Sequence, residues 1–265
     1  KHQVTVIVTD HKKAPQQGKN VAVKGDLGQS AAGKTDKNGE LTVPEVEQTE
    51  RHGIYIVGYT DGTFGPSRSM TRAEAAAIFA RLLAEKNGDT ISTAANTKFA
   101  DIPAHAWYSG YVKYLSNNGI TYGKSKTIFA PNDAITRAEF TTMAVRFFDV
   151  YGDGDAEIME QFSGFNDVSS GYWAAEYIKY AALHGWINGY GDGSFHADRE
   201  INRAEVVTIV NRLLGREADE DYIADNLRKL NTFPDVTKRH WAYYAVMEAA
   251  NAHTAVLGES ESWSK

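Results

Sequence analysis

The clearest alternation of hydrophobic and polar positions lies in residues 165–215, and it predicts a helix, a short extended piece, a turn and a second helix. Apolar and aromatic residues recur at helical spacing over residues 173–184. Polar Asn202, followed three residues later by Glu205, has the spacing of a capping box and predicts the start of the second helix. Gly215 stands where that helix is expected to end.

The same unit recurs along the chain with a nearly fixed period. In each copy a Trp follows an Asp by six positions, and an Arg lies at the start of the second helix. The Trp residues are Trp107, Trp173 and Trp241, which are 66 and 68 positions apart, and the Arg residues are Arg72, Arg137 and Arg203, which are 65 and 66 apart. A fixed period predicts a repeat protein whose units stack to bury a shared core.

Three short motifs make up each repeat. The first is a head of the form Phe-x-Asp-Val, found at residues 99–102, 165–168 and 233–236 with small variations. The others are Gly-Tyr-x-Asp-Gly-Thr-Phe, seen in full at residues 58–64, and Thr-Arg-Ala-Glu at residues 71–74. These residues resemble the S-layer homology (SLH) domain family of bacterial surface proteins, and the resemblance covers about residues 54–253.

This resemblance implies a mainly α fold, in which a pseudo-threefold SLH bundle of helix–loop–helix units follows a small N-terminal all-β segment. It also implies a non-catalytic anchor, located extracellularly in the cell wall or S-layer of a Gram-positive bacterium. The implied ligand is a secondary cell-wall polysaccharide that is acidic and pyruvylated, bound in grooves between repeats. Other S-layer subunits are possible partners, and the expected state is a monomeric pseudo-trimer.

Two domains are expected, a small β-rich segment over residues 1–50 and the SLH domain over residues 51–265. Two SLH repeats are continuous, at residues 99–150 and 165–215. Residues 54–88 lack the first half of a repeat and residues 233–253 lack the second half, so we expect these two pieces to pack together as the third repeat. In the alternative interpretation, the missing halves lie outside this chain.

The N-terminal segment has a different pattern. Short runs of β-branched residues predict strands at residues 4–8, 21–23 and 41–44, with a turn at residues 35–39. The segment resembles part of an Ig-like β-sandwich module, but it has fewer strands than the seven or so of a complete sandwich.

The composition of the chain excludes several functional classes. A net charge of −6 and a pI near 5.8 argue against a nucleic-acid partner, and no apolar run is long enough to span a membrane. The chain has no Cys, its eight His include no spaced ligand pair, and none of the common hydrolase or nucleotide-binding motifs is present. We therefore expect no enzyme activity, no cofactor and no metal.

An acidic run at residues 149–160 is interpreted as a solvated loop rather than a calcium site. No signal peptide opens the chain, so we expect Lys1 to be a processed or cut end.

The six recurring Arg and Trp residues are the candidate ligand-binding residues. An Arg beside free N–H groups at a helix start would form an anion-binding corner, and its guanidinium can hold a carboxylate with two parallel hydrogen bonds. In the alternative interpretation, each Arg pairs with an acidic residue of the neighbouring repeat and joins the two. A Trp at the start of an amphipathic helix is usually part of the core, whereas at a groove edge it can stack on a sugar ring.

The remaining recurring residues are expected to be structural. Asp101, Asp167 and Asp235 are predicted helix N-caps. Residues 121–126 depart from the Gly-Tyr-x-Asp-Gly pattern, so we expect the groove that involves this repeat to differ from the other two. Two functions remain, a wall-glycan anchor and a structural module that self-associates without sugar. A hydrolase is a distant third.

Overall fold

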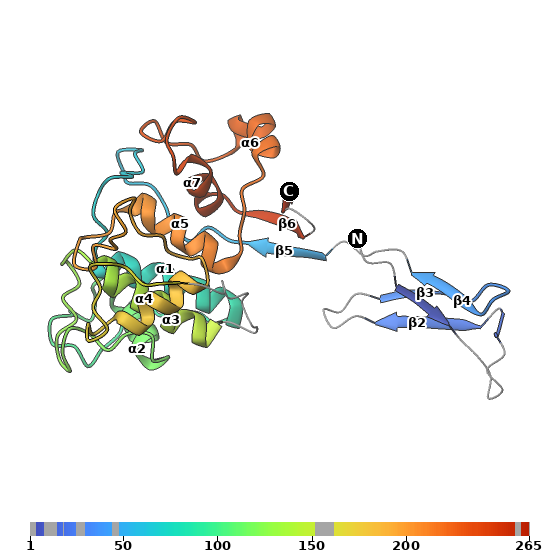
Figure 1. Cartoon of the computed structure of the whole chain (residues 1–265), viewed down its shortest axis with the longest axis horizontal. Coiled ribbons are helices and arrows are strands. Elements are labelled where there is room, and N and C mark those ends of the chain that lie inside the picture. Colours follow the sequence, from blue (N-terminus) through green and yellow to red (C-terminus); the bar gives the residue numbers. More distant parts are fainter. Residues whose placement is uncertain are drawn as a thin grey trace. The chain divides into compact units, whose positions relative to one another are not determined.

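The computed structural model describes residues 4–7, 15–17, 19–24, 30–43, 48–151, 162–257 and 261–264. The chain divides into two compact units, one made of Lys1–Glu50 with Thr254–Ser264 and the other of Arg51–His253 with Lys265. The second unit contains all of the described helices (Figure 1). The predicted fold class, mainly α with a small β part, is confirmed.

The described strands are short, and the pairs β1–β4, β2–β3 and β6–β7 are antiparallel. Strand β1 pairs with β4, β2 pairs with β3, and β5, β6 and β7 form a sheet in that order. Strand β3 was not predicted, because its sequence Ser-Ala-Ala-Gly-Lys has low β-propensity and becomes extended by pairing with β2. The bounds are β1 Val4–Ile7, β2 Asn20–Lys24, β3 Ser30–Lys34, β4 Glu40–Val43, β5 Gln48–His52, β6 His253–Leu257 and β7 Ser262–Ser264.

The second unit alternates long and short helices. Each long helix packs against the short helix that follows it in the ring of repeats, giving the pairs α1–α2, α3–α4 and α5–α7. A further helix, α6, lies between the second continuous repeat and residues 233–253. The bounds are α1 Arg72–Asn87, α2 Ser109–Asn117, α3 Arg137–Tyr151, α4 Ala175–Leu183, α5 Arg203–Leu214, α6 Glu220–Asn226, η1 Leu227–Lys229 and α7 Tyr243–Ala250.

The long helices begin as the sequence predicts. Asn202 and Glu205 form a reciprocal capping box at the start of α5, and Gly215 ends that helix in the left-handed conformation. Thr71 and Glu74 form the same box at the start of α1. These local signals require only neighbouring residues, which explains why they are readable from sequence.

The predicted N-caps of the short helices are wrong. Helices α2, α4 and α7 begin at residues whose side chains make no cap hydrogen bond. The three Asp carboxylates instead accept backbone N–H groups from the second half of a repeat. Asp101 accepts those of Phe129 and Ala130, Asp167 accepts those of Phe195 and His196, and Asp235 accepts those of Phe64 and Gly65. Each Asp therefore holds together the two halves of a repeat.

A ring of three backbone hydrogen bonds lies at the centre of the helical unit. The N–H of Met70 donates to Ile201 O at 2.9 Å, that of Ile201 to Ile135 O at 3.0 Å, and that of Ile135 to Met70 O at 2.9 Å. All three side chains are fully buried. Because each repeat supplies one equivalent residue, this ring marks the pseudo-threefold axis of the bundle.

The two separated pieces of chain make the same contacts as the continuous repeats. The rings of Phe64 and Phe233 lie 5.3 Å apart between centroids, compared with 5.5 Å for Phe99–Phe129 and 5.1 Å for Phe165–Phe195. These distances, with the Asp235 hydrogen bonds, support the interpretation of residues 54–88 and 233–253 as one split repeat. The acidic run suggested as a loop lies mostly outside the described residues.

Candidate functional site

The first residue of each long helix is a buried Arg that reaches into the following repeat. Its Nε donates to a backbone carbonyl at 2.8 Å in all three cases. The pairs are Arg72 with Phe129 O, Arg137 with Phe195 O and Arg203 with Phe64 O. We call these three places the Arg72, Arg137 and Arg203 junctions.

Each Arg also pairs with the capping-box Glu of the following repeat. The nitrogen–oxygen distances are 3.1 Å for Arg72–Glu139, 3.1 Å for Arg137–Glu205 and 3.6 Å for Arg203–Glu74. The pairs form a closed cycle, because the third returns to the helix on which the first begins. Each Arg therefore joins two repeats. This is the contact that the alternative interpretation predicted, in which each Arg pairs with an acidic residue of the neighbouring repeat.

The expected free N–H groups beside these Arg residues are not there. The backbone N–H of Arg72 donates to Asp133 O at 3.0 Å, and that of Ala73 donates to Pro131 O at 3.0 Å. The starts of α3 and α5 are bonded in the same way to their neighbouring repeats. The first-turn donors are used inside the protein, so the prediction of an anion corner built on them is wrong.

Two of the junctions hold a Tyr between two guanidinium groups. The ring of Tyr59 lies 4.6 Å from the Arg203 guanidinium carbon and 4.4 Å from that of Arg68. The ring of Tyr190 lies 5.1 Å from that of Arg137 and 5.6 Å from that of Arg199. Arg68 and Arg199 are exposed, and Arg199 also pairs with Glu205 and donates to the Tyr190 hydroxyl.

The Arg72 junction has different side chains. Lys124 stands at the position of the Tyr, and its Nζ lies 3.4 Å from a carboxylate oxygen of Asp133, which replaces the exposed Arg. Counting one Glu in each, the other two junctions have two guanidinium groups against one carboxylate. The Arg72 junction has two cations, Arg72 and Lys124, against two carboxylates. Among these side chains, the Arg137 and Arg203 junctions have one more cation than carboxylate, whereas the Arg72 junction has equal numbers.

Each of these two junctions also has an ionised carboxylate in its adjacent turn, Asp61 at the Arg203 junction and Asp192 at the Arg137 junction, and each is hydrogen-bonded within its own loop. Asp61 accepts the N–H of Thr63 at 2.9 Å and Asp192 accepts that of Ser194 at 2.9 Å. Hydrogen bonds from the Thr63 and Ser194 side chains, and then from their N–H groups, lower the pKa of each carboxyl below its ordinary value.

Burial also changes the pKa of two of the junction Arg residues. Removal from water lowers the pKa of Arg137 and of Arg203, and the nearby Tyr and Glu side chains oppose that change. A guanidinium begins from so high a pKa that both remain charged at neutral pH.

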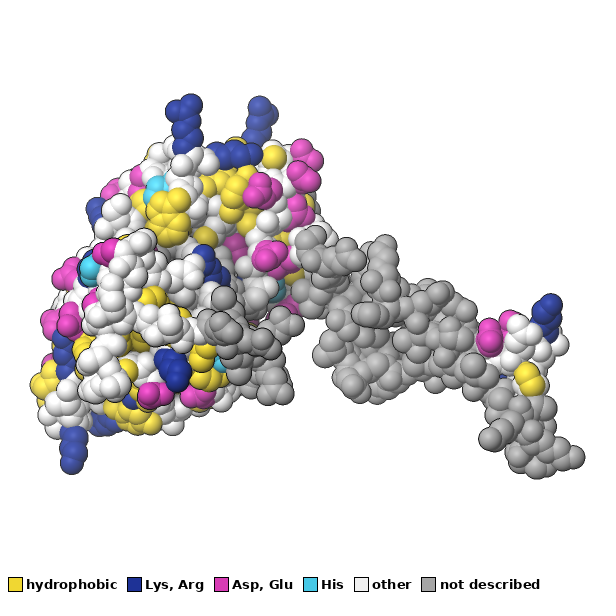
Figure 2. Space-filling model, in the orientation of Figure 1, with side chains coloured by type: hydrophobic (Ala, Val, Ile, Leu, Met, Phe, Trp, Pro, Cys, Tyr) yellow, Lys and Arg dark blue, Asp and Glu magenta, His cyan; other side chains and the backbone are white. Residues whose placement is uncertain are grey.

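The three Trp side chains lie on the surface. Trp107, Trp173 and Trp241 are 54%, 57% and 64% exposed, so the interpretation of these residues as core is wrong. Figure 2 shows hydrophobic side chains among charged ones on one face of the helical unit. Among the described residues, no hydrogen bond or ring contact joins one of these Trp residues to one of the three junction Arg residues.

Arg68 and Arg199 are candidate residues that the sequence reasoning missed. Each precedes its long-helix Arg by four positions, and Asp133 takes that position before Arg137. The signal was therefore present in the repeat alignment. A separate cavity of about 620 Å³ lies between α6 and α7, lined partly by Leu227, Tyr243 and Tyr244, and it contains none of the predicted residues.

The chain matches a known protein family, and the matched segments fall on the three repeats. The family model described as "S-layer homology domain" matches residues 42–76, 98–141 and 164–207. The helical part of this chain belongs to the S-layer homology family. Residues 233–253 lie beyond these matches, and their place in the fold follows from the contacts of Phe233 and Asp235.

Curated relatives carry the same region. Cell surface glycoprotein 1 of Acetivibrio thermocellus is 34% identical over 218 residues, which is 79% of this chain and 9% of that protein. The cellulosome-anchoring protein of the same organism is 30% identical over 233 residues, 87% of this chain and 49% of that protein. The surface-layer 125 kDa protein of Lysinibacillus sphaericus is 32% identical over 163 residues, 60% of this chain and 13% of that protein. This chain thus spans less than half the length of these relatives.

Family membership makes this SLH region a non-enzymatic module of a cell-surface protein. Within the described part of the chain, none of the helices combines the length and the apolar character that crossing a membrane requires.

Proposed function

We propose that this chain anchors a surface protein to the cell wall by binding an acidic, pyruvylated wall polysaccharide at the Arg137 and Arg203 junctions. The observation that carries the proposal is the exposed Arg stacked on a Tyr at these two places, Arg68 on Tyr59 and Arg199 on Tyr190. A guanidinium can bind a carboxylate with two parallel hydrogen bonds, and the face of an aromatic ring can pack on a sugar.

The buried Arg residues support this site from below. Arg137 and Arg203 add positive charge beneath the Tyr rings while their own donors hold backbone carbonyls of the next repeat. Their contribution to an anionic ligand is electrostatic, and the exposed Arg supplies the direct hydrogen bonds. The predicted Arg72 site is the weakest of the three, because Asp133 there would repel a ligand carboxylate.

The exposed Trp residues extend the binding surface. Each lies just before a short helix and exposes more than half of its side chain, which is unusual for so large an apolar group. Trp107, Trp173 and Trp241 are therefore proposed to stack on neighbouring sugars of the polymer. Two weak sites on one body gain avidity on a repeating ligand, because binding at one raises the effective concentration at the other.

Co-sedimentation with purified cell-wall sacculi, before and after removal of the secondary polymer, tests the proposal. The variant Arg68→Gln/Arg199→Gln removes the two exposed guanidinium groups. A matched control, Lys113→Gln/Lys179→Gln, removes two exposed cations from equivalent positions of α2 and α4. We expect wild type and control to bind polymer-containing walls alike, and the Arg variant to bind more than about 10-fold more weakly, since hydrogen bonds to charged groups contribute about 1.5–3 kcal/mol each.

Equal binding by the Arg variant and the control would remove these two residues from the site. Wild-type binding that survives polymer removal would exclude the polymer as ligand. Concentration-dependent self-association without wall binding, measured by sedimentation velocity, would instead support the alternative function of a structural S-layer assembly module.

A further inference from the structure

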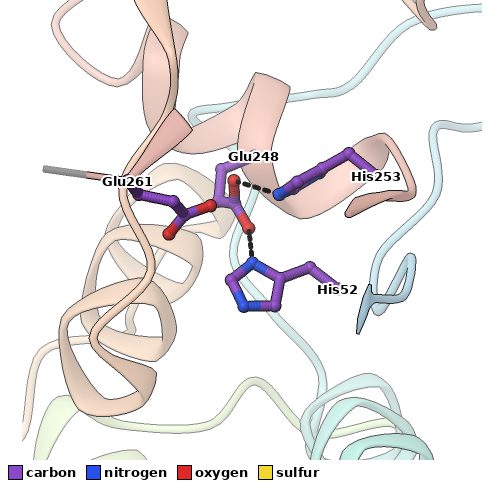
Figure 3. Close-up of side chains that lie close together, drawn as sticks. All are labelled: His52, Glu248, His253 and Glu261. Carbon is purple, nitrogen blue, oxygen red and sulfur yellow. Dashed lines mark ion pairs between the residues drawn. The ribbon is translucent and has the colours of Figure 1, made fainter. Parts of the chain in front are cut away.

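A buried carboxylate lies between two buried imidazoles where the chain enters and leaves the helical unit. Glu248, on α7, is only 1% exposed. Its Oε1 lies 3.3 Å from Nδ1 of His52, at the end of β5, and its Oε2 lies 3.3 Å from Nε2 of His253, at the start of β6 (Figure 3). Glu261, also labelled in Figure 3, belongs to the other compact unit.

The contacts of Glu248 do not have the geometry of strong hydrogen bonds. Neither of its carboxylate oxygens accepts a hydrogen bond from a described residue, and 3.3 Å exceeds the 2.7–2.9 Å or so typical of charge-assisted pairs. Arg216 is also buried, but its guanidinium donates to Gly53 O at 3.5 Å. A carboxylate removed from water in this way requires a cation close to it.

The contact of Nδ1 of His253 determines which of its two ring nitrogens carries the proton. Its Nδ1 lies 3.0 Å from the backbone carbonyl oxygen of Asn251, which can only accept a hydrogen bond. Nδ1 therefore carries the proton, and in a neutral ring the Nε2 lone pair points toward the Glu248 carboxylate. Two lone pairs facing each other repel, whereas a metal ion between them would be bound by both. A backbone carbonyl that fixes the tautomer of a His is a common outer partner of a metal ligand.

The spacing fits a small tetrahedral cation. Zinc bonds to His nitrogen and carboxylate oxygen of roughly 2.0–2.2 Å place neighbouring ligand atoms of a tetrahedron about 3.3–3.6 Å apart. The two His–Glu distances are 3.3 Å and end on different oxygens of Glu248, so the carboxylate would bind the ion through both oxygens, and the candidate ligand atoms all lie within 4.8 Å of one another. Two imidazoles with one carboxylate are typical zinc ligands, whereas calcium and magnesium prefer oxygen.

From this geometry we infer that His52, Glu248 and His253 bind a divalent zinc ion that joins the first and last residues of the helical unit. Three protein ligands leave a fourth position for water or another donor. His52 lies two residues before one piece of the split repeat, and Glu248 and His253 belong to the other, so the metal would reinforce the closure made by Asp235. The sequence does not suggest this site, because 201 positions separate the two His residues (253 − 52).

Zinc binding by the metal-depleted full chain tests the inference. Isothermal titration with ZnCl₂ and visible absorption after Co²⁺ addition measure the site directly. We compare wild type with His52→Gln, Glu248→Gln and His253→Gln, and use His105→Gln, an exposed His of the same unit, as the matched control. Wild type and control are expected to bind one ion per chain with a tetrahedral Co²⁺ spectrum. Each ligand variant is expected to lose more than about 10-fold in affinity, the smallest loss typical even for changes to outer partners.

Thermal unfolding gives a second readout. The midpoint of wild type should rise on zinc addition and fall back with EDTA, and that response should be absent from the ligand variants. Failure of the wild-type chain to bind zinc would overturn the inference and leave a proton between His and Glu as the cation. Zinc bound equally well by all variants would overturn it too. The wild-type titration decides the matter even if a variant does not fold, and circular dichroism identifies that case.

Discussion

The Asp235 carboxylate accepts the backbone N–H of Phe64 at 2.9 Å, although 171 positions separate the two residues. It also accepts the N–H of Gly65 at 2.7 Å. Asp101 makes the same pair of bonds to residues that follow it by 28 and 29 positions. The repeat is therefore defined by a contact between its two halves, and the chain need not run directly from one to the other.

Replacing Asp235 by Ala should destabilise the helical unit. The change removes two charge-assisted hydrogen bonds and leaves the N–H groups of Phe64 and Gly65 without this partner. We expect a loss of about 1.5–3 kcal/mol in the free energy of unfolding, measured by urea denaturation. Asp225→Ala, an exposed Asp on α6, is the control and should change stability by less than about 0.5 kcal/mol. Similar losses in both variants would contradict a closing role for Asp235.

The buried and exposed Arg of one junction should behave differently when each is replaced by Met. Arg203→Met removes hydrogen bonds to Phe64 O and Val57 O and leaves Glu74 without its buried cation. We expect a loss of about 3 kcal/mol, as is typical when one partner of a buried pair is removed. Arg68→Met, at an exposed position, should cost less than about 0.5 kcal/mol. Equal urea midpoints would show that burial of Arg203 adds no stability.

Local signals made much of the fold predictable. The capping boxes and the stop at Gly215 depend on residues within one helix turn, so their sequence spacing is sufficient. The role of Asp101 was not predictable in that way, because its partners come from across the repeat. A polar residue before a helix looks like a cap whether or not it turns toward another segment.

The candidate site also combines features that were predictable from the sequence with features that were not. The recurrence of Arg137 and its neighbours identified the junctions, but burial of the guanidinium and exposure of Trp173 depend on how repeats pack. The difference at Asp133 was visible in the sequence, yet its meaning required the ion pair with Lys124. The His52–Glu248–His253 cluster was beyond reach, since no periodicity or motif relates its members.

The Arg72 junction can be given the composition of the other two. The variant Lys124→Tyr/Asp133→Arg places a Tyr and an exposed Arg where Tyr190 and Arg199 stand in the Arg137 junction. We expect tighter wall binding in co-sedimentation, by about 10-fold, because a third site adds avidity and a repelling carboxylate is removed. The reverse change, Tyr190→Lys/Arg199→Asp, should weaken binding. A variant that folds but binds as wild type would argue against the charge difference as the determinant.

Acid should weaken the Asp167 contact in a defined pH range. Burial alone would raise the pKa of Asp167, but the N–H groups of Phe195 and His196 outweigh it and hold the pKa below its ordinary value. A lowered folded-state pKa means that the contribution to stability is fully present above the ordinary pKa and is lost as pH falls through the folded one. The stability gap between wild type and Asp167→Asn, from urea unfolding at several pH values, should therefore close with acid. A gap independent of pH would contradict this.

The pseudo-threefold axis should be the most sensitive part of the core. Ile135 is fully buried where its backbone joins Met70 and Ile201, so Ile135→Ala leaves a cavity that three repeats share. We expect a loss of about 2–5 kcal/mol in the free energy of unfolding, as for other large-to-small changes of this kind. Ile128→Ala in the same repeat is the control, because Ile128 is 41% exposed and its truncation should leave no cavity. One cooperative urea transition with a lowered midpoint would show that the repeats unfold together. Two separate transitions would mean that the axis does not couple them.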